Sequence, residues 1–250
     1  MSLLMRRGII SSAKGGDITG NLATFNGSTS TLTVADDIAF TCDTFSLSMV
    51  INSNDVSVQQ SLFRNRAPGG GGTVAGIATE INSSSLSVNN VSDDGAGNFV
   101  SLSSSIPLSS STQYNIVYTF DGVDMNIYLN STKEVITLIK TGTVGTIDSP
   151  NALEIGSLLG GRFFDGGLGF VKFWKNRVLN QTEVTTLYNS GVPKSFATLE
   201  ASLKTSLTYA PEVANYGVSS VGNELVDKSA SSLTTTPTDI LYTTPITVNI

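Results

Sequence analysis

Short runs in which apolar and polar residues alternate make up most of the chain, and glycine-rich turns separate them. In residues 44–52, Phe45, Leu47 and Met49 alternate with Ser46 and Ser48. Successive side chains of a strand point to opposite faces, so this run has one apolar and one polar face. The pattern predicts a half-buried strand of an antiparallel sheet.

The most regular pattern predicts a hairpin over residues 114–130. Its first strand places Tyr114, Ile116, Tyr118 and Phe120 on one face, Asp121-Gly122 forms the turn, and Met125, Ile127 and Leu129 return. An Asp-Gly pair between two alternating runs is a strong hairpin signal.

Weaker alternation predicts the remaining strands. Residues 22–34 read as two strands joined around Asn26-Gly27. Further strands are expected over 61–64, within 76–91, over 135–139, and at the C-terminus, where Ile246, Val248 and Ile250 alternate. Gly69–Gly72 is expected to be a mobile loop, and residues 93–98 a tight turn.

The region from Gly166 to Gly191 predicts a strand followed by a short helix. In the strand, Leu168, Phe170 and Trp174 are expected on one face and Val171 and Phe173 on the other.

The helix has a clear beginning and end. Asn180 is the expected N-cap, Glu183 completes a capping box, and Leu179 with Val184 forms a hydrophobic staple. Leu187 and Tyr188 extend the apolar stripe, and Gly191 and Pro193 stop the helix. One apolar face predicts a lone helix that closes the sandwich rather than one that carries an active site.

Many short strands, glycine turns and a single helix predict an all-β fold, an antiparallel jelly-roll β-sandwich with one short helix. We expect residues 1–16 to be an N-terminal arm, 17–191 the sandwich, and 192–250 a β-rich C-terminal extension. This extension either completes an edge of the sandwich or adds to a neighbour's sheet.

The chain resembles laminin-G-like, concanavalin-A-like lectin domains over about residues 17–191. The C-terminal signature of that family is matched by Ile155-Gly156, Phe164-Asp165-Gly166, Leu168 to Trp174, Leu179, Glu183, Leu187-Tyr188 and Gly191. The beginning is similar at Phe25-Asn26-Gly27, and the central pair at Asp121-Gly122 and Tyr128-Leu129-Asn130. The chain departs from the family at Gly169, where an acidic residue is usual, and at Ser131, where glycine is usual.

The amino-acid composition excludes several classes of functional site. Charged residues make up only 14% of the 250 residues, the net charge is −6, and no basic stripe for nucleic acid is present. Histidine is absent, which removes Ser-His-Asp triads and nearly all zinc sites, and Cys42 is alone, which leaves no disulfide. We expect that residues 1–16 are not a signal peptide, because two arginines interrupt their apolar residues, and no stretch approaches the length of a membrane helix.

No residue is assigned a catalytic, cofactor-binding or metal-binding role. The 20 acidic residues contain no pair at i, i+2 or i, i+4, the spacing that would place two carboxylates on one strand face as a retaining glucanase requires. A non-enzymatic protein without a cofactor is therefore predicted, and a catalytic pair assembled from separate strands is the alternative that this spacing leaves open. Calcium at Asp93-Asp94 is a minor alternative because the spacing does not match an EF-hand, and Trp174 is expected in the core rather than in a sugar site.

These features favour a structural role. The N-terminal sequence followed by a laminin-G-like sandwich resembles phage virion proteins, which implies an auxiliary decoration protein on a phage capsid, made in the host cytoplasm. Its partners would be capsid or other virion proteins, held through terminal segments such as Leu3, Leu4, Ile9 and Ile10. The alternative is a carbohydrate-binding fibre or adhesin domain that contacts host glycans; homo-oligomerisation is left open.

Overall fold

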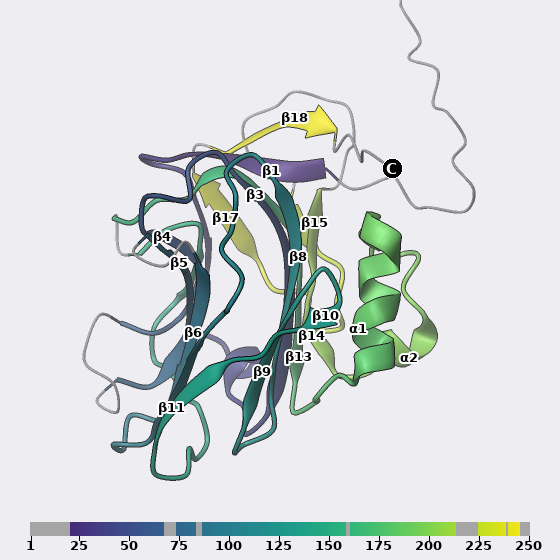
Figure 1. Ribbon diagram of the computed structural model, residues 1–250. Helices are drawn as coiled ribbons and strands as arrows, with labels where there is room; N and C mark the ends of the chain where they lie inside the picture. Colours follow the sequence, from purple (N-terminus) through teal and green to yellow (C-terminus); the bar gives the residue numbers. More distant parts are fainter. Residues whose placement is uncertain are drawn as a thin grey trace, which may run out of the picture.

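Two antiparallel sheets pack face to face in the computed structural model, which describes residues 21–67, 74–83, 87–158, 161–213, 225–238 and 240–245 (Figure 1). Their apolar inner faces enclose one large core. The predicted all-β sandwich with one short helix is confirmed.

The first sheet contains β1 (Asn21–Asn26), β3 (Phe45–Ser53), β8 (Gln113–Phe120), β9 (Met125–Leu129), β10 (Thr132–Lys133), β13 (Asp165–Lys175), β14 (Leu207–Tyr209) and β18 (Leu241–Pro245). The second contains β2 (Thr31–Val34), β4 (Gln60–Arg64), β5 (Gly76–Asn82), β6 (Ser87–Asp93), β7 (Phe99–Ser103), β11 (Thr137–Thr141), β12 (Leu153–Ile155) and β17 (Thr235–Thr238). A separate ribbon pairs β15 (Pro211–Val213) with β16 (Leu225–Asp227), and the helices are η1 (Ile38–Phe40), α1 (Gln181–Tyr188), η2 (Asn189–Gly191) and α2 (Ala201–Lys204).

Strand order places early and late parts of the chain side by side. The first sheet runs β10-β9-β8-β3-β13-β1-β18, with β14 also paired to β13, and the second runs β11-β7-β6-β5-β4-β12-β2-β17. β18 therefore extends the first sheet beside β1, and β17 extends the second beside β2. Of the two alternatives for the C-terminal segment, its described strands take the first and complete the sandwich.

Aromatic rings connect the two sheets across the core. Phe173 of β13 stacks on Phe63 of β4 at 5.9 Å between ring centroids, and on Phe45 of β3 at 5.6 Å. Phe40 of η1 meets Phe63 and Phe173 edge-on. Such pairs add about 0.5–1.5 kcal/mol each beyond the burial of their area, so this aromatic cluster contributes strongly to the contact between the sheets.

The predicted hairpin over 114–130 is confirmed as β8 and β9. Tyr118 is opposite Ile127 and Phe120 is opposite Met125, and all four side chains are buried in the core. The strands predicted at 61–64 and within 76–91 are also present, the latter as β5 and the beginning of β6. The strand predicted at 135–139 is present as β11, two residues further along.

Asn26-Gly27 joins two strands as predicted, although they belong to different sheets. The turn is held by Asn26, whose Oδ1 accepts hydrogen bonds from the backbone N–H groups of Ser28, Thr29 and Ser30. It therefore carries the chain across the edge of the sandwich from β1 to β2.

β3 is more buried than its alternating pattern predicts. Ser46 and Ser48, on its polar face, are both buried. The Ser46 hydroxyl donates to the Arg177 carbonyl at 2.9 Å and accepts from the Leu179 N–H at 2.9 Å. The segment leading into α1 covers this polar face at Ser46, whose hydroxyl is therefore buried but hydrogen-bonded.

The prediction for the faces of β13 was wrong at Leu168. The pairing of β13 with β3 shifts between Gly169 and Lys172, and Phe170 has φ +50° within this bulge. An extra residue reverses the alternation after it. Leu168 therefore shares the inner face with Val171 and Phe173, while Phe170 and Trp174 point outward.

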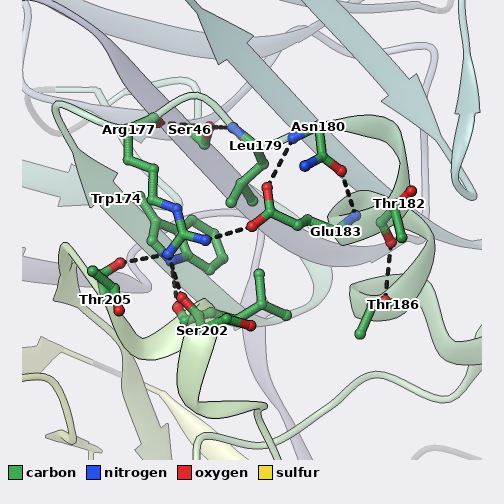
Figure 2. A network of polar contacts seen from close by, with 11 residues as sticks. Ser46, Trp174, Arg177, Leu179, Asn180, Thr182, Glu183, Thr186, Ser202 and Thr205 are labelled. Atoms are coloured by element: carbon green, nitrogen blue, oxygen red, sulfur yellow. Dashed lines mark hydrogen bonds and ion pairs between the residues drawn. The ribbon is translucent and has the colours of Figure 1, made fainter.

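Helix α1 begins as predicted. The Asn180 side chain accepts from the Glu183 N–H at 3.1 Å, and the Glu183 carboxylate accepts from the Asn180 N–H at 2.9 Å, which completes the capping box (Figure 2). Leu179 and Val184, the predicted staple, are both buried.

The helix does not act as a lone clip closing the sandwich, because it builds a second core with α2 on the outer face of the first sheet (Figure 1). Trp174 is buried in this second core, and its indole N–H donates a hydrogen bond to the Leu203 carbonyl at 2.6 Å. Arg177 ties the two helices together by contacting the Glu183 carboxylate and the carbonyls of Ser202 and Thr205 (Figure 2).

Some predictions fall on residues outside the described ranges. These are the N-terminal arm over 1–16, the loop Gly69–Gly72, and the final alternation at Ile246, Val248 and Ile250. None of the described helices is long and apolar enough to cross a membrane.

Candidate functional site

The outer face of the second sheet is the one broad sheet surface that no described helix covers, since α1 and α2 lie on the first sheet (Figure 1). We call it the open face. One row of outward positions crosses all eight strands from β17 to β11: Thr236, Thr33, Glu154, Arg64, Ala78, Val91, Ser101 and Ile139.

Strand alternation directs these side chains outward. Leu153 and Ile155 are buried in the core on either side of Glu154, and Val100 and Leu102 are buried on either side of Ser101. Glu154 and Ser101 therefore point away from the core. Arg64 and Ala78, in the same row, also point away from the core but are themselves buried. By the same register, Gly76, Asp93, Phe99 and Thr141 form one flanking row, and Ser61 and Glu80 belong to the other.

An exposed ion pair marks one side of the open face. Arg162 contacts Glu80 at 2.9 Å between Nη1 and Oε2, and the two side chains are 42% and 20% exposed. Gln59 donates its amide to the other oxygen of Glu80 at 2.9 Å. Arg162 has φ +47°, and its carbonyl accepts from the Ser61 N–H at 2.8 Å, which holds its loop against β4.

A buried ion pair lies on the other side. Arg66 contacts Asp93 at 3.0 Å, with side chains that are 5% and 0% exposed. The other oxygen of Asp93 accepts from the Gly95 N–H at 2.8 Å. Because the pair is enclosed, its role is to fix the end of the sheet rather than to contact a ligand directly.

Arg64 and Glu154 are neighbours in the central row. The Arg64 guanidinium donates to the carbonyls of Arg66 and Ala67. Burial lowers the Arg64 pKa, as does the nearby Arg66, while Glu80 and Glu154 oppose the shift. An arginine pKa starts so high that the group stays charged at neutral pH. Glu154 accepts from the Ser157 hydroxyl at 2.9 Å.

Phe99 gives the open face a half-buried aromatic ring beside the Arg66–Asp93 pair. Val91 and Ile139 lie in the adjacent row, and Ile139 is 61% exposed. The surface thus combines apolar area with hydrogen-bond donors and acceptors that are held in place. Trp174, by contrast, is fully buried under α2, so the prediction that it belongs to a core is confirmed.

The Asp93–Asn98 turn uses its carboxylates internally. Asp94 accepts from the N–H groups of Ala96, Asn98 and Gly145 and from the Asn98 amide. Burial alone would raise the Asp94 pKa, but these hydrogen bonds outweigh it and the pKa is lowered. The calcium alternative gains no support here, and the described residues contain no cluster of three metal-ligating side chains.

Sequence reasoning did not single out the open face. The sequence predicts Arg64 on a strand, but its position opposite Glu154 depends on the pairing of β4 with β12, two segments 90 residues apart in the chain. A usable signal was present, because Glu80 and Glu154 each occupy a polar position of an apolar strand.

The chain matches the family model described as "Concanavalin A-like lectin/glucanases superfamily", of the laminin G type, over residues 26–185. The match covers more than half of the chain, which therefore belongs to this family. The laminin-G-like resemblance seen in the sequence is confirmed. No curated protein sequence matches the chain significantly.

Solved structures share the fold at low sequence identity. A Bacteroides ovatus protein, provisionally described as carbohydrate-binding, superposes with a TM-score of 0.62 at 15% identity and covers 92% of this chain. This chain spans 62% of that structure. A heptameric pentraxin from Limulus polyphemus (TM-score 0.48, 18% identity, 69% of this chain and 83% of the other) and mouse laminin α1 LG4-5 (0.48, 12%, 65% and 43%) are also similar.

Proposed function

We propose that this protein is a non-enzymatic carbohydrate-binding module and that the open face is its binding surface. The observation that carries the proposal is the arrangement of Arg162, Glu80 and Gln59 at one side of a sheet face that no described helix covers and that presents Phe99 at its other side. Each sugar hydroxyl both donates and accepts a hydrogen bond, so adjacent guanidinium, amide and carboxylate groups suit it. An aromatic ring suits the apolar face of a sugar.

Support for a binding role rather than catalysis comes from the carboxyl groups. Glycosidases require a general acid with a raised pKa. At Asp55, Asp94 and Glu200, hydrogen bonds lower the carboxyl pKa although burial opposes the shift, which is the opposite of what a general acid needs. Glu80 and Glu154 are held by Arg162 and Ser157, respectively. The similarity to the Bacteroides ovatus protein, which is itself described as carbohydrate-binding, agrees with this proposal.

A glycan array followed by calorimetry tests it. We expect the wild-type chain to bind a defined set of glycans, and Phe99→Ala and Arg162→Ala to weaken binding at least about tenfold each, the loss of roughly 1.4 kcal/mol. Lys204→Ala, on α2 at the opposite face, is the matched control and should bind normally. Unchanged binding by both open-face variants would rule out this surface.

We also propose that the module is part of a phage particle, where it decorates the capsid or forms a fibre or adhesin domain. This proposal rests on the sequence resemblance to virion proteins and on the apolar residues within 1–16. Deletion of residues 1–16 should leave thermal melting unchanged and abolish co-sedimentation with the assembled particle. A truncated chain that still attaches normally would contradict anchoring through this arm.

A further inference from the structure

The charges on the open face balance, and this bears on which glycans it accepts. Its register positions and their direct partners bring together three arginines, Arg64, Arg66 and Arg162, and three acids, Glu80, Asp93 and Glu154. Three positive and three negative charges sum to zero at this surface, on a chain with a formal net charge of −6.

None of the three arginines presents an exposed guanidinium without an acidic partner, because Arg64 and Arg66 are buried and Arg162 is paired with Glu80. Arg66 is enclosed with Asp93, and Arg64 donates to two backbone carbonyls beside Glu154. Arg162, the exposed one, contacts Glu80 through Nη1. A carboxylate or sulfate gains most from a bidentate guanidinium whose charge is not already neutralised. An acidic sugar would meet the Glu80 carboxylate at the very place where it needs Arg162.

A neutral sugar meets no such penalty. Its hydroxyls can donate to Glu80 and accept from Arg162 or Gln59 while the ion pair stays intact. Exposed ion pairs of this kind add little stability by themselves, so the main effect of this pair on binding is to select ligands by the sign of their charge.

We propose that the open face selects neutral glycans and that Glu80 is the residue that excludes acidic ones. This inference rests on the proposed carbohydrate-binding function and adds the substrate class. Glu80 acts by neutralising the charge of Arg162, and the Gln59 amide fixes the orientation of the Glu80 carboxylate.

The test compares wild type with Glu80→Gln and Arg162→Gln, which keep the side-chain length of Glu80 and an amide donor at position 162. Neutral probes are cellohexaose, maltohexaose and xylohexaose, and acidic probes are hexagalacturonate and a heparin hexasaccharide. Calorimetry at 50 and 300 mM NaCl is preceded by thermal melting, so that loss of folding is recognised.

We expect wild type to bind a neutral probe with less than about a twofold change between the two salt concentrations. Glu80→Gln should gain affinity for acidic probes by about two- to fivefold, with the gain lost at high salt. Arg162→Gln should weaken neutral binding without that gain. Wild type that prefers an acidic probe, or Glu80→Gln without any gain, overturns the neutral selection alone. Wild type that binds no probe overturns the proposed function and this inference together.

Discussion

At the scale of single residues, one position requires glycine because the two sheets approach each other closely there. Gly156, which follows β12, has φ +80°, and a Cβ placed on it would lie 2.1 Å from a ring carbon of the buried Phe25. Both the backbone conformation and the space require glycine at this position. The Gly that the family signature contains after Ile155 therefore has a direct steric reason.

Gly156→Ala should destabilise the fold by about 1–3 kcal/mol more than Gly97→Ala, because only the first also forces a side chain into a filled space. Gly97 is a matched control, since it has φ +103° but nothing within 4 Å of its hypothetical Cβ. Urea denaturation of both variants measures the difference. Equal losses would show that backbone strain alone accounts for the need for glycine.

Cys42 should be unreactive in the folded protein. Burial raises its thiol pKa from 9.0 to about 12, only partly offset by Lys175. The reactive thiolate is then about 10⁻⁴ of the population at pH 8. A thiol reagent should modify Cys42 only after denaturant is added. Because the folded pKa is the higher one, the stability that this thiol contributes is present below pH 9 and decreases as the pH rises toward 12. Rapid labelling at pH 8 without denaturant would contradict its burial.

At the scale of elements, α1 is stabilised both by local hydrogen bonds at its N-terminus and by tertiary packing of its apolar side chains. Its capping box is encoded within four consecutive residues, whereas Leu187 contributes only because α2 and the first sheet cover it. An isolated helix of this length is marginal in water, so the packing of its apolar stripe accounts for most of its stability.

Asn180→Ala should cost about 1 kcal/mol and Leu187→Ala about 2–5 kcal/mol of unfolding free energy. Thr185→Ala, at an exposed position of the same helix, is the control and should stay within about 0.5 kcal/mol. Denaturant titration gives all three values. If Leu187→Ala cost no more than Thr185→Ala, the second core around Trp174 would not contribute to global stability.

At the scale of the whole molecule, the described part of residues 192–250 contributes strands to both sheets and side chains to both cores. Tyr209 and Ile240 are buried in the main core, and Leu203 and Leu207 in the second core. β14, β17 and β18 also pair with strands from the first 175 residues.

A chain that ends at Gly191 should therefore fail to fold cooperatively, because it removes strands from both sheets and side chains from both cores. Soluble yield and a calorimetric melting curve, compared with the full chain, measure this. A truncated chain that melts sharply near the full-length temperature would show that residues 192–250 are dispensable.

The sequence alone determined the class of fold, the hairpin over 114–130 and the beginning of α1. These features depend on neighbouring residues: alternation, an Asp-Gly turn and a capping box act within a few positions. Tertiary structure decided the rest. The bulge at Phe170 reversed the faces of β13 because one extra residue changes the parity of a strand. The open face places Arg64 beside Glu154, which is 90 residues away in the chain, and only the pairing of β4 with β12 decides that these two residues are neighbours.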